Sequence, residues 1–350
     1  MRRRMMDMLA CPVCGRSFDL SISVLEKVGC GEYSFPECSN YCAYISRDLG
    51  PPSKRKGAYT HCRECYQEDV ASGALTCPEG HTYPIRKSIP RFVSTCPING
   101  RTKRTFDVEW GVFHYEEKIY GHTQDEELED FFRRMVVDEA FLRNKTILDV
   151  GCGVGRLAQS IGRLAREVVA IDLSGGVDEA RIRNRDRGSV HVIQGDIMAL
   201  PLRTCSYEYA YAKGVLHYVS DPRKCISGLA DVVKPGGGLS ITIYPRMSPL
   251  FEIFNRQLRR ITVKLPISMV FRLSFLLLPF FSLSWKWSGV EKRPIEWGER
   301  AHMIFNWLSS AHQNRATNEE VLGWFRECGF EQMKVSDIPV GITGTKRVPP

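Results

Sequence analysis

The glycine-rich stretch TILDVGCGVGR, residues 146–156, has the residue types and spacing of a loop that holds a nucleotide-like ligand. Gly151 and Gly153 allow the backbone to turn tightly and to approach a ligand closely. A dinucleotide-binding loop follows G-x-G-x-x-G, but Arg156 occupies the position of the third glycine. Asp149, directly before the loop, suits a cationic ligand better than a pyrophosphate. S-adenosylmethionine, with its ammonium and sulfonium groups, fits this pattern better than a nicotinamide dinucleotide.

Two more acids follow short apolar runs further along the chain. Asp172 ends Val168–Ile171, roughly twenty residues after the glycines, where a carboxylate can accept hydrogen bonds from both ribose hydroxyls. Asp196 follows Val190–Ile193 and can accept from an adenine amino group. These spacings predict an adenosine-containing ligand.

Strands alternating with helices can position these acids at one edge of a sheet. Such alternation predicts an α/β domain with a parallel sheet. The expected strands are 147–150, 168–171, 190–193, 209–212 and 239–244, and the expected helices are 156–166, 176–187 and 222–233. An amphipathic helix from about 126 should pack on the sheet or over the site. A capped helix at 318–330 precedes a final antiparallel pair at 333–337 and 341–347.

With these motifs in order, residues 144–245 resemble the class I S-adenosylmethionine-dependent methyltransferases of the type 11 kind. The resemblance also covers G-D-x-x-x-L-P at 195–201, Val215–Asp221 and the turn Val233–Gly238. It implies a doubly wound, Rossmann-like, seven-stranded sheet. The implied cofactor-binding residues are Asp149, Gly151, Gly153, Asp172, Asp196, Ile197 and Lys213.

Methyl transfer is an in-line displacement at an activated methyl group, so the protein mainly supplies alignment. An oxygen or nitrogen acceptor can also need a general base. His217 follows the fourth expected strand and is the first candidate for this catalytic role, with Tyr218 and Tyr244 next. A structural histidine is an equal alternative.

The amino-terminal cysteines form a second group with chemical meaning. Cys11-Pro-Val-Cys14-Gly and Cys77-Pro-Glu-Gly-His81 offer three thiolates and an imidazole, a closed and therefore structural zinc set. A second zinc site could use Cys38, Cys42, Cys62 and Cys65. A rival pairing joins Cys11 and Cys14 to Cys62 and Cys65.

The segment that ends at Val93 resembles a small zinc-ribbon domain that activates or precedes several methyltransferases. We therefore expect a zinc-ribbon domain at 1–100 with a cysteine-rich insertion at about 25–75, a helical linker or cap at 101–143, and a methyltransferase domain at 144–350. We expect the two domains to have separate cores. Clustered cysteines and the lack of a visible signal peptide predict a reducing, cytoplasmic location.

An apolar segment at about 247–300 interrupts the methyltransferase pattern. Phe251, Phe254, Leu258, Ile261 and Leu265 form a helical stripe, with Arg256, Arg259, Arg260 and Lys264 away from it. The following run from Met269 is too short without interruption to span a bilayer. A helical cap over the acceptor pocket is the first interpretation, a membrane-surface contact the second and an oligomer contact the third.

Three function classes follow from these observations. The first is transfer of methyl to an oxygen or nitrogen of a small-molecule, lipid-linked or sugar-linked acceptor, which the apolar segment favours. The second is methylation of an RNA base, which the basic residues favour: sixteen Lys/Arg stand against ten Asp/Glu in residues 1–105. The third is a non-catalytic partner that only binds the cofactor. The sequence predicts neither the acceptor nor the oligomeric state.

Overall fold

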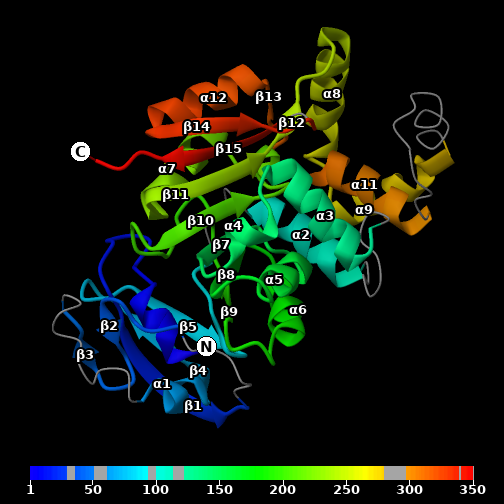
Figure 1. The fold of residues 1–350 in the computed structure, drawn as a ribbon. Helices are drawn as coiled ribbons and strands as arrows, with labels where there is room; N and C mark the ends of the chain where they lie inside the picture. Colours follow the sequence, from blue (N-terminus) through cyan, green and yellow to red (C-terminus); the bar gives the residue numbers. More distant parts are fainter. Residues whose placement is uncertain are drawn as a thin grey trace.

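The protein consists of a small amino-terminal sheet domain below a larger α/β domain, as Figure 1 shows for a computed structural model. The structure describes residues 1–29, 36–50, 61–93, 100–112, 122–279, 297–338 and 340–349. Parts of the expected insertion and of the expected cap, at 30–35, 51–60 and 280–296, lie outside these residues.

A seven-stranded sheet forms the centre of the larger domain, in the order β14-β15-β11-β10-β7-β8-β9. Strands β7 to β11 pair in parallel, whereas β15 runs antiparallel to both β11 and β14. This confirms the predicted Rossmann-like fold. The bounds are β7 Thr146–Val150, β8 Glu167–Asp172, β9 Val190–Gln194, β10 Tyr207–Ala212, β11 Val233–Thr242, β14 Phe330–Val335 and β15 Gly341–Lys346.

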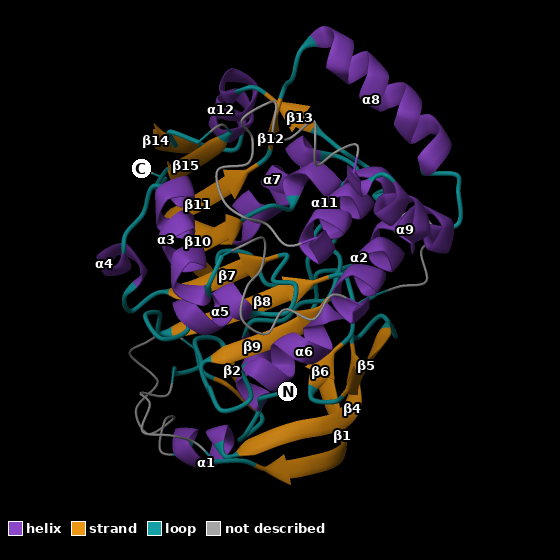
Figure 2. Ribbon diagram, turned by 90° about the vertical axis from the view of Figure 1, so that its right-hand side faces the viewer, coloured by secondary structure: helices purple, strands orange, loops and turns teal. Residues whose placement is uncertain are grey.

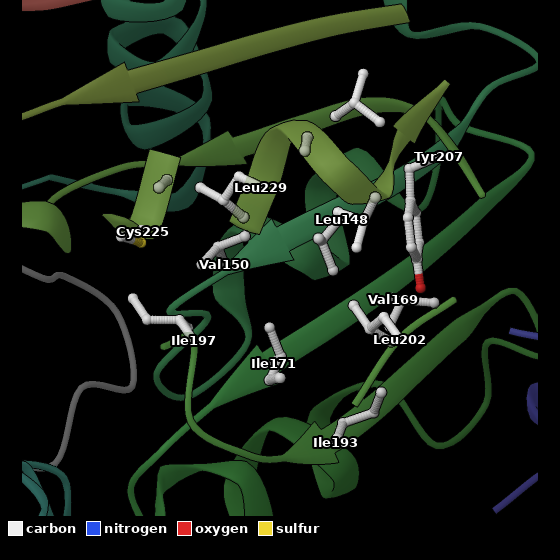
Figure 3. Packing of buried hydrophobic residues seen from close by; sticks show 14 of the residues in the cluster. Leu148, Val150, Val169, Ile171, Ile193, Ile197, Leu202, Tyr207, Cys225 and Leu229 are labelled. Atoms are coloured by element: carbon white, nitrogen blue, oxygen red, sulfur yellow. The ribbon is translucent and has the colours of Figure 1, made fainter. Parts of the chain in front are cut away.

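Both faces of this sheet are covered, so its central strands are apolar throughout. Side chains alternate between the two faces along a strand. Val169 and Ile171 of β8 belong to one core cluster, and Val168 and Ala170 belong to the other. Figure 3 shows Val169 and Ile171 with the α7 residue Leu229 and their other neighbours in the first cluster. Because both faces of these strands are buried, the sequence shows uninterrupted apolar runs and not an alternation of apolar and polar residues.

Helices flank the sheet, and several begin at residues that cap them. Thr123 and Glu126 form a capping box before α3, and Thr317 and Glu320 form one before α12. Asp221 caps α7 through the Lys224 amide. The bounds are α2 Gly100–Val112, α3 Gln124–Met135, α4 Glu139–Leu142, α5 Arg156–Ile161, α6 Gly176–Arg183, η4 Leu216–Tyr218, α7 Pro222–Val232 and α12 Asn318–Glu327. Helix α3 packs on the sheet through Phe131, whose ring lies 4.8 Å from that of Tyr211.

The amino-terminal domain is a four-stranded sheet in the order β1-β4-β5-β6. A short 3-10 helix precedes it, and a small hairpin and a short helix lie between its first two strands. The bounds are η1 Arg3–Asp7, β1 Asp19–Lys27, β2 Tyr41–Cys42, β3 Arg47–Asp48, α1 Cys62–Tyr66, β4 Glu68–Thr76, β5 Thr82–Arg86 and β6 Ile89–Pro90.

The two domains share one core, so the expectation of separate cores is wrong. Leu9 and Phe92 of the amino-terminal domain belong to the same apolar cluster as Ile193 of β9. The Phe92 amide donates to the Gln194 carbonyl at 2.7 Å, and Leu9 forms an antiparallel bridge with Leu202. The sequence could not predict this because the contacts join residues more than a hundred positions apart.

Buried charges also join the domains. Glu167 accepts from Arg4 at 3.0 Å and lies 2.9 Å from His191. Burial raises the pKa of Glu167, but Arg4 and His191 outweigh burial and lower it to about 2. Removing one member of such a network leaves an uncompensated buried charge.

A helical segment after β11 completes the larger domain. It contains β12 Tyr244–Pro245, α8 Pro249–Thr262, α9 Ile267–Leu276, α11 Trp297–Ser309 and β13 Arg315–Ala316. Helix α8 projects from the body, as the two views in Figures 1 and 2 agree. Among the helices of the described residues, none is both long and apolar enough to cross a membrane.

Candidate active site and metal centre

The loop after β7 has the backbone conformation that its glycines predict. Gly151, Gly153 and Gly155 all have positive φ angles, of 77°, 52° and 74°. A Cβ atom on Gly151 would lie 2.3 Å from the Val215 side chain, and one on Gly153 would lie 2.8 Å from the Trp110 ring. Larger residues therefore cannot replace these glycines without moving the loop.

Asp149 lies at the end of β7, below this loop, and is buried. Its Oδ2 atom has no hydrogen-bond partner among the described residues. Burial raises the pKa of Asp149 to about 7, and Asp172 adds to the increase, whereas the Tyr211 hydroxyl opposes it. An orphaned buried carboxylate is costly, and a cationic ligand would compensate it.

Asp172 ends β8 beside the same loop. Its Oδ2 accepts from the Gly153 amide at 2.9 Å, and its Oδ1 accepts from the amide and hydroxyl of Ser174 at 2.8 and 2.7 Å. Asp196 follows β9, where its carboxylate accepts from the Met198 amide at 2.9 Å. Thus both acids come from the carboxyl ends of adjacent parallel strands, as the sequence predicts for a nucleoside site.

The other predicted cofactor residues differ in their surroundings. Ile197 is buried next to Asp196. Lys213 follows β10, and its Nζ lies 3.2 Å from the Asp130 carboxylate on α3. Arg156 stands in place of the third motif glycine, where its buried side chain pairs with Glu127 of α3 at 3.2 Å. Helix α3 is therefore held to the glycine loop and to the end of β10 by charge.

His217 lies on the 3-10 helix η4, inside an aromatic cluster. Its ring stacks on Tyr244 at 3.7 Å and meets Tyr218 edge-on at 4.1 Å. The Tyr218 and Tyr244 hydroxyls are 2.9 Å apart. Burial lowers the pKa of His217 to about 3, and the charge of Arg315 contributes. A neutral imidazole with so low a pKa is a weak base at neutral pH.

Helix α2 connects this cluster to the glycine loop. The sequence analysis does not predict that residues of this helix belong to the site. Phe106 contacts Tyr218 with ring centroids 5.2 Å apart, and Trp110 lies against Gly153. The two side chains are one turn apart, so about 6 Å separates them along the helix axis. The aromatic cluster and the loop therefore lie next to each other.

A buried acid–imidazole pair adjoins Trp110. Glu109 of α2 and His302 of α11 approach to 2.6 Å, and both side chains are inaccessible to solvent. The sequence gives little signal for this pair, because the two residues are far apart along the chain and neither lies in a motif.

The first predicted zinc set is assembled in the amino-terminal domain. The donor atoms of Cys11, Cys14, Cys77 and His81 all lie within 4.8 Å of one another. Cys14 Sγ is 3.6 Å from Cys77 Sγ, and His81 Nδ1 is 3.2 Å from Cys77 Sγ. Ligands about 2.3 Å from a tetrahedral zinc are about 3.8 Å apart, so the spacing fits the metal.

The backbone around Cys11 also suits a thiolate. Burial disfavours the charge on Cys11, but the amides of Cys14 and Val13 outweigh burial and lower the pKa of the thiol to about 7. The turn after Cys14 depends on Gly15, which has φ 72°. Such amide-lined turns are typical of zinc knuckles.

The second cysteine set is less closely gathered. Cys38, Cys42 and Cys65 are buried and Cys62 is partly buried. In the part of the chain that the structure describes, no three of these sulfur atoms come within the spacing that the first set shows. The structure does not bring Cys11 and Cys14 together with Cys62 and Cys65. A second metal site stays a prediction.

Comparison with known families places both domains. Residues 148–241 match the family described as "Methyltransferase domain", and residues 2–88 match "Trm112p-like protein". These two matches confirm the resemblance seen in the sequence, a methyltransferase domain that follows a Trm112p-like amino-terminal segment.

Several curated relatives are methyltransferases by description. The demethylmenaquinone methyltransferase of Renibacterium salmoninarum is 30% identical over 132 residues, which are 37% of this chain and 55% of that protein. The ubiquinone biosynthesis O-methyltransferase of Hydrogenovibrio crunogenus is 36% identical over 100 residues, 27% of this chain and 41% of that protein. The chain thus spans about half the length of the curated relatives it matches.

Solved structures with a similar fold include magnesium protoporphyrin IX methyltransferase from Synechocystis with bound SAH. It is 14% identical, with a TM-score of 0.44, and the match covers 71% of this chain and 99% of that one. A second example is a complex of the Haloferax volcanii Trm112 methyltransferase activator with a "putative methyltransferase". It is 15% identical, with a TM-score of 0.42, and the match covers 69% of this chain and 98% of that one.

Proposed function

We propose that this chain transfers methyl from S-adenosylmethionine to an oxygen or nitrogen of a small, apolar acceptor. The observation that carries the proposal is Asp149, a buried carboxylate with one oxygen that has no hydrogen-bond partner among the described residues, below a loop of three positive-φ glycines. Asp172 accepts from the Gly153 amide of the same loop, in the pattern of a nucleoside site. The cofactor supplies an activated methyl group when bound. The residues present fit it, because they offer an anion for its cationic end and two further acids for its nucleoside.

The residues of the chain have separate tasks in this proposal. Asp149 would hold the ammonium group, and Asp172 and Asp196 would accept from the ribose and the adenine. Trp110 covers the loop and excludes water from the donor. The electron-rich face of an indole also favours a sulfonium nearby.

The aromatic cluster of Phe106, Tyr218 and Tyr244 is the proposed acceptor site. It adjoins the loop through α2, and a flat apolar acceptor would stack on such rings. The pKa of about 3 argues against His217 as the base, so its role here is to position Tyr244 by stacking. We propose the Glu109–His302 pair as the alternative base, because its carboxylate can orient its imidazole and the pair adjoins Trp110.

The relatives support a small-molecule acceptor over RNA. Those named above are quinone methyltransferases by description, and another is a malonyl-[acyl-carrier protein] O-methyltransferase. We propose that the Trm112p-like domain stabilises the methyltransferase domain from within the same chain, through the shared core and the Arg4–Glu167–His191 network.

Calorimetric titration of the full chain with S-adenosylmethionine, its demethylated product and NAD tests the proposal. We expect both sulfur compounds to bind and NAD not to bind. Asp172→Asn should weaken binding at least tenfold, because a charged acceptor contributes about 1.5–3 kcal/mol per bond. Asp186→Asn, at an exposed position, is the matched control. Binding of NAD alone would refute the proposal.

A further inference from the structure

Helix α8 is packed with its polar side inward, opposite to the usual arrangement of a surface helix. Its buried residues are Asn255, Arg259 and Thr262. Arg259 donates to the carbonyl oxygens of Trp307 and Ser310, and burial lowers its pKa to about 10. Thus hydrogen bonds hold α8 to the body together with the apolar contacts of Phe251 and Leu258. The expected apolar stripe is buried only in part: Leu258 and Leu265 pack against a core cluster, whereas Phe254 and Ile261 are exposed.

The apolar side of α8 faces outward instead. Leu250, Ile253, Phe254 and Ile261 are 81%, 55%, 56% and 64% exposed. At 100° per residue, these four positions span an arc of about 100°, so they lie on one side of the helix, with the polar Gln257 among them. Scattered exposed apolar residues are ordinary, but a stripe along a projecting helix indicates a binding surface.

Helix α9 also exposes large apolar side chains. Met269, Phe275 and Leu276 are exposed there, whereas Val270 and Ser274 are buried. The apolar outer surface therefore occurs on both helices of the pair.

Basic residues accompany this surface. Arg256 and Arg260 on α8, Lys264 in the turn after it and Arg272 on α9 are exposed, and none of them pairs with an acid among the described residues. The sequence from 249 to 276 contains one acid, Glu252, whose carboxylate already lies 3.5 Å from Arg315. Arg256 and Arg260 lie on one flank of the apolar stripe, since they follow Ile253 by three and seven residues on the side away from Phe254.

We propose that α8 and α9 dock on the surface of an anionic lipid bilayer, with the apolar stripe among the acyl chains and the basic residues at the headgroups. An in-plane amphipathic helix with large apolar and basic residues is suited to this position. A protein groove would also accept the stripe, but the unpaired basic flank complements a negative surface. The helices lie on the membrane and do not cross it.

The inner side of α8 is linked to the proposed acceptor site. Arg315 lies over the rings of both Tyr244, in the acceptor cluster, and Phe251, on α8, at 5.5 and 5.4 Å. Docking would therefore bring the cluster close to the lipid, which favours an acceptor dissolved in the bilayer. This last step rests on the proposed function, whereas the docking itself does not.

Co-sedimentation of the full chain with sucrose-loaded vesicles tests the docking without cofactor or acceptor. Vesicles contain phosphatidylcholine alone or with about a third phosphatidylglycerol. The wild type should pellet with the anionic vesicles. Phe254→Ser/Ile261→Ser should bind at least about tenfold more weakly, because two large apolar side chains no longer enter the membrane. Ile182→Ser/Val335→Ser, at exposed apolar positions elsewhere, should bind as wild type.

A charge variant separates the two contributions. Arg256→Gln/Arg260→Gln/Lys264→Gln should lose about fivefold per charge, roughly a hundredfold in all. Its matched control, Arg163→Gln/Lys224→Gln/Arg326→Gln, removes the same charge from other surfaces and should lose little.

Three outcomes would overturn the docking proposal. One is a wild type that stays in solution with anionic vesicles. Another is apolar and charge variants that bind as tightly as their controls while far-ultraviolet circular dichroism shows them folded. The third is a lipid-free dimer in analytical ultracentrifugation that Phe254→Ser/Ile261→Ser dissociates, since the stripe would then serve a second copy. Cofactor titration is independent, so failure of docking and failure of the proposed function are distinguishable.

Discussion

Replacing Asp149 by asparagine should stabilise the ligand-free protein while weakening cofactor binding. The carboxyl has an ordinary pKa of 3.8 in the unfolded chain and about 7 in the folded one. The difference corresponds to roughly 4 kcal/mol, at about 1.4 kcal/mol for each pKa unit. Because the pKa of Asp149 is higher in the folded protein, its ionisation lowers the free energy of unfolding. This contribution to stability is fully present below pH 3.8, where the carboxyl is protonated in both states, and it is lost as the pH rises through 7.

The variant removes this loss, so the two proteins should diverge in a defined pH window. Asp149→Asn and wild type should have similar stability near pH 4, and the variant should gain up to about 4 kcal/mol by pH 8. Urea denaturation followed by circular dichroism at four pH values measures the gain. Asp186→Asn, at an exposed carboxylate, is the control and should show no such trend.

Cofactor affinity should change in the opposite direction. Loss of a charged acceptor for the ammonium group costs about 1.5–3 kcal/mol, a tenfold or greater weakening. In the wild type, ligand binding below pH 7 should release a proton as Asp149 ionises, which calorimetry in two buffers of different ionisation enthalpy detects. A variant that is destabilised at pH 8, or that binds S-adenosylmethionine as wild type does, would refute this reasoning.

Further substitutions test the rest of the account. Cys14→Ser should release zinc, which mass spectrometry of the metal content measures. It should also lower the stability of the whole chain, because the two domains share a core. The control Cys205→Ser, at an exposed position, should do neither. Glu167→Gln should cost about 3 kcal/mol at pH 7 in urea denaturation, and the wild type should lose this stabilisation as the pH falls from 4.5 through 2. Because the pKa of His217 is about 3, its side chain should stay neutral, and the rate of methyl transfer should not depend on its titration near pH 6.5. If the rate does change near pH 6.5 and His217→Asn removes that change, His217 is the base.

Most of the sheet and the conformation of the glycine loop after β7 could be predicted from the sequence. Their signals are local: buried strands read as apolar runs, and Gly151 and Gly153 stand where only glycine fits the turn. The zinc set could also be predicted, because each half of it lies within five residues. In each case the residues that work together are close in the chain or in a motif.

The sequence named Tyr218 and Tyr244 as candidates, but it could not predict their contact with α2 or the interface between the two domains. Phe106 and Tyr218 meet only because α2 crosses above the glycine loop, and Glu109 meets His302 across nearly two hundred residues. The inward-facing polar side of α8 was also missed. The amphipathic pattern predicts which residues lie on the same side of a helix, but not which side is buried. In α8 the polar side is buried, because Arg259 donates to the carbonyl oxygens of Trp307 and Ser310.

A crystal structure of the full chain with S-adenosylhomocysteine tests the central claim most directly. The account predicts the ligand along Gly151–Gly155, with its amino group at the Asp149 carboxylate and its ribose hydroxyls at Asp172. Density for the ligand at any other site, or an Asp149 carboxylate with no contact to it, would contradict the account.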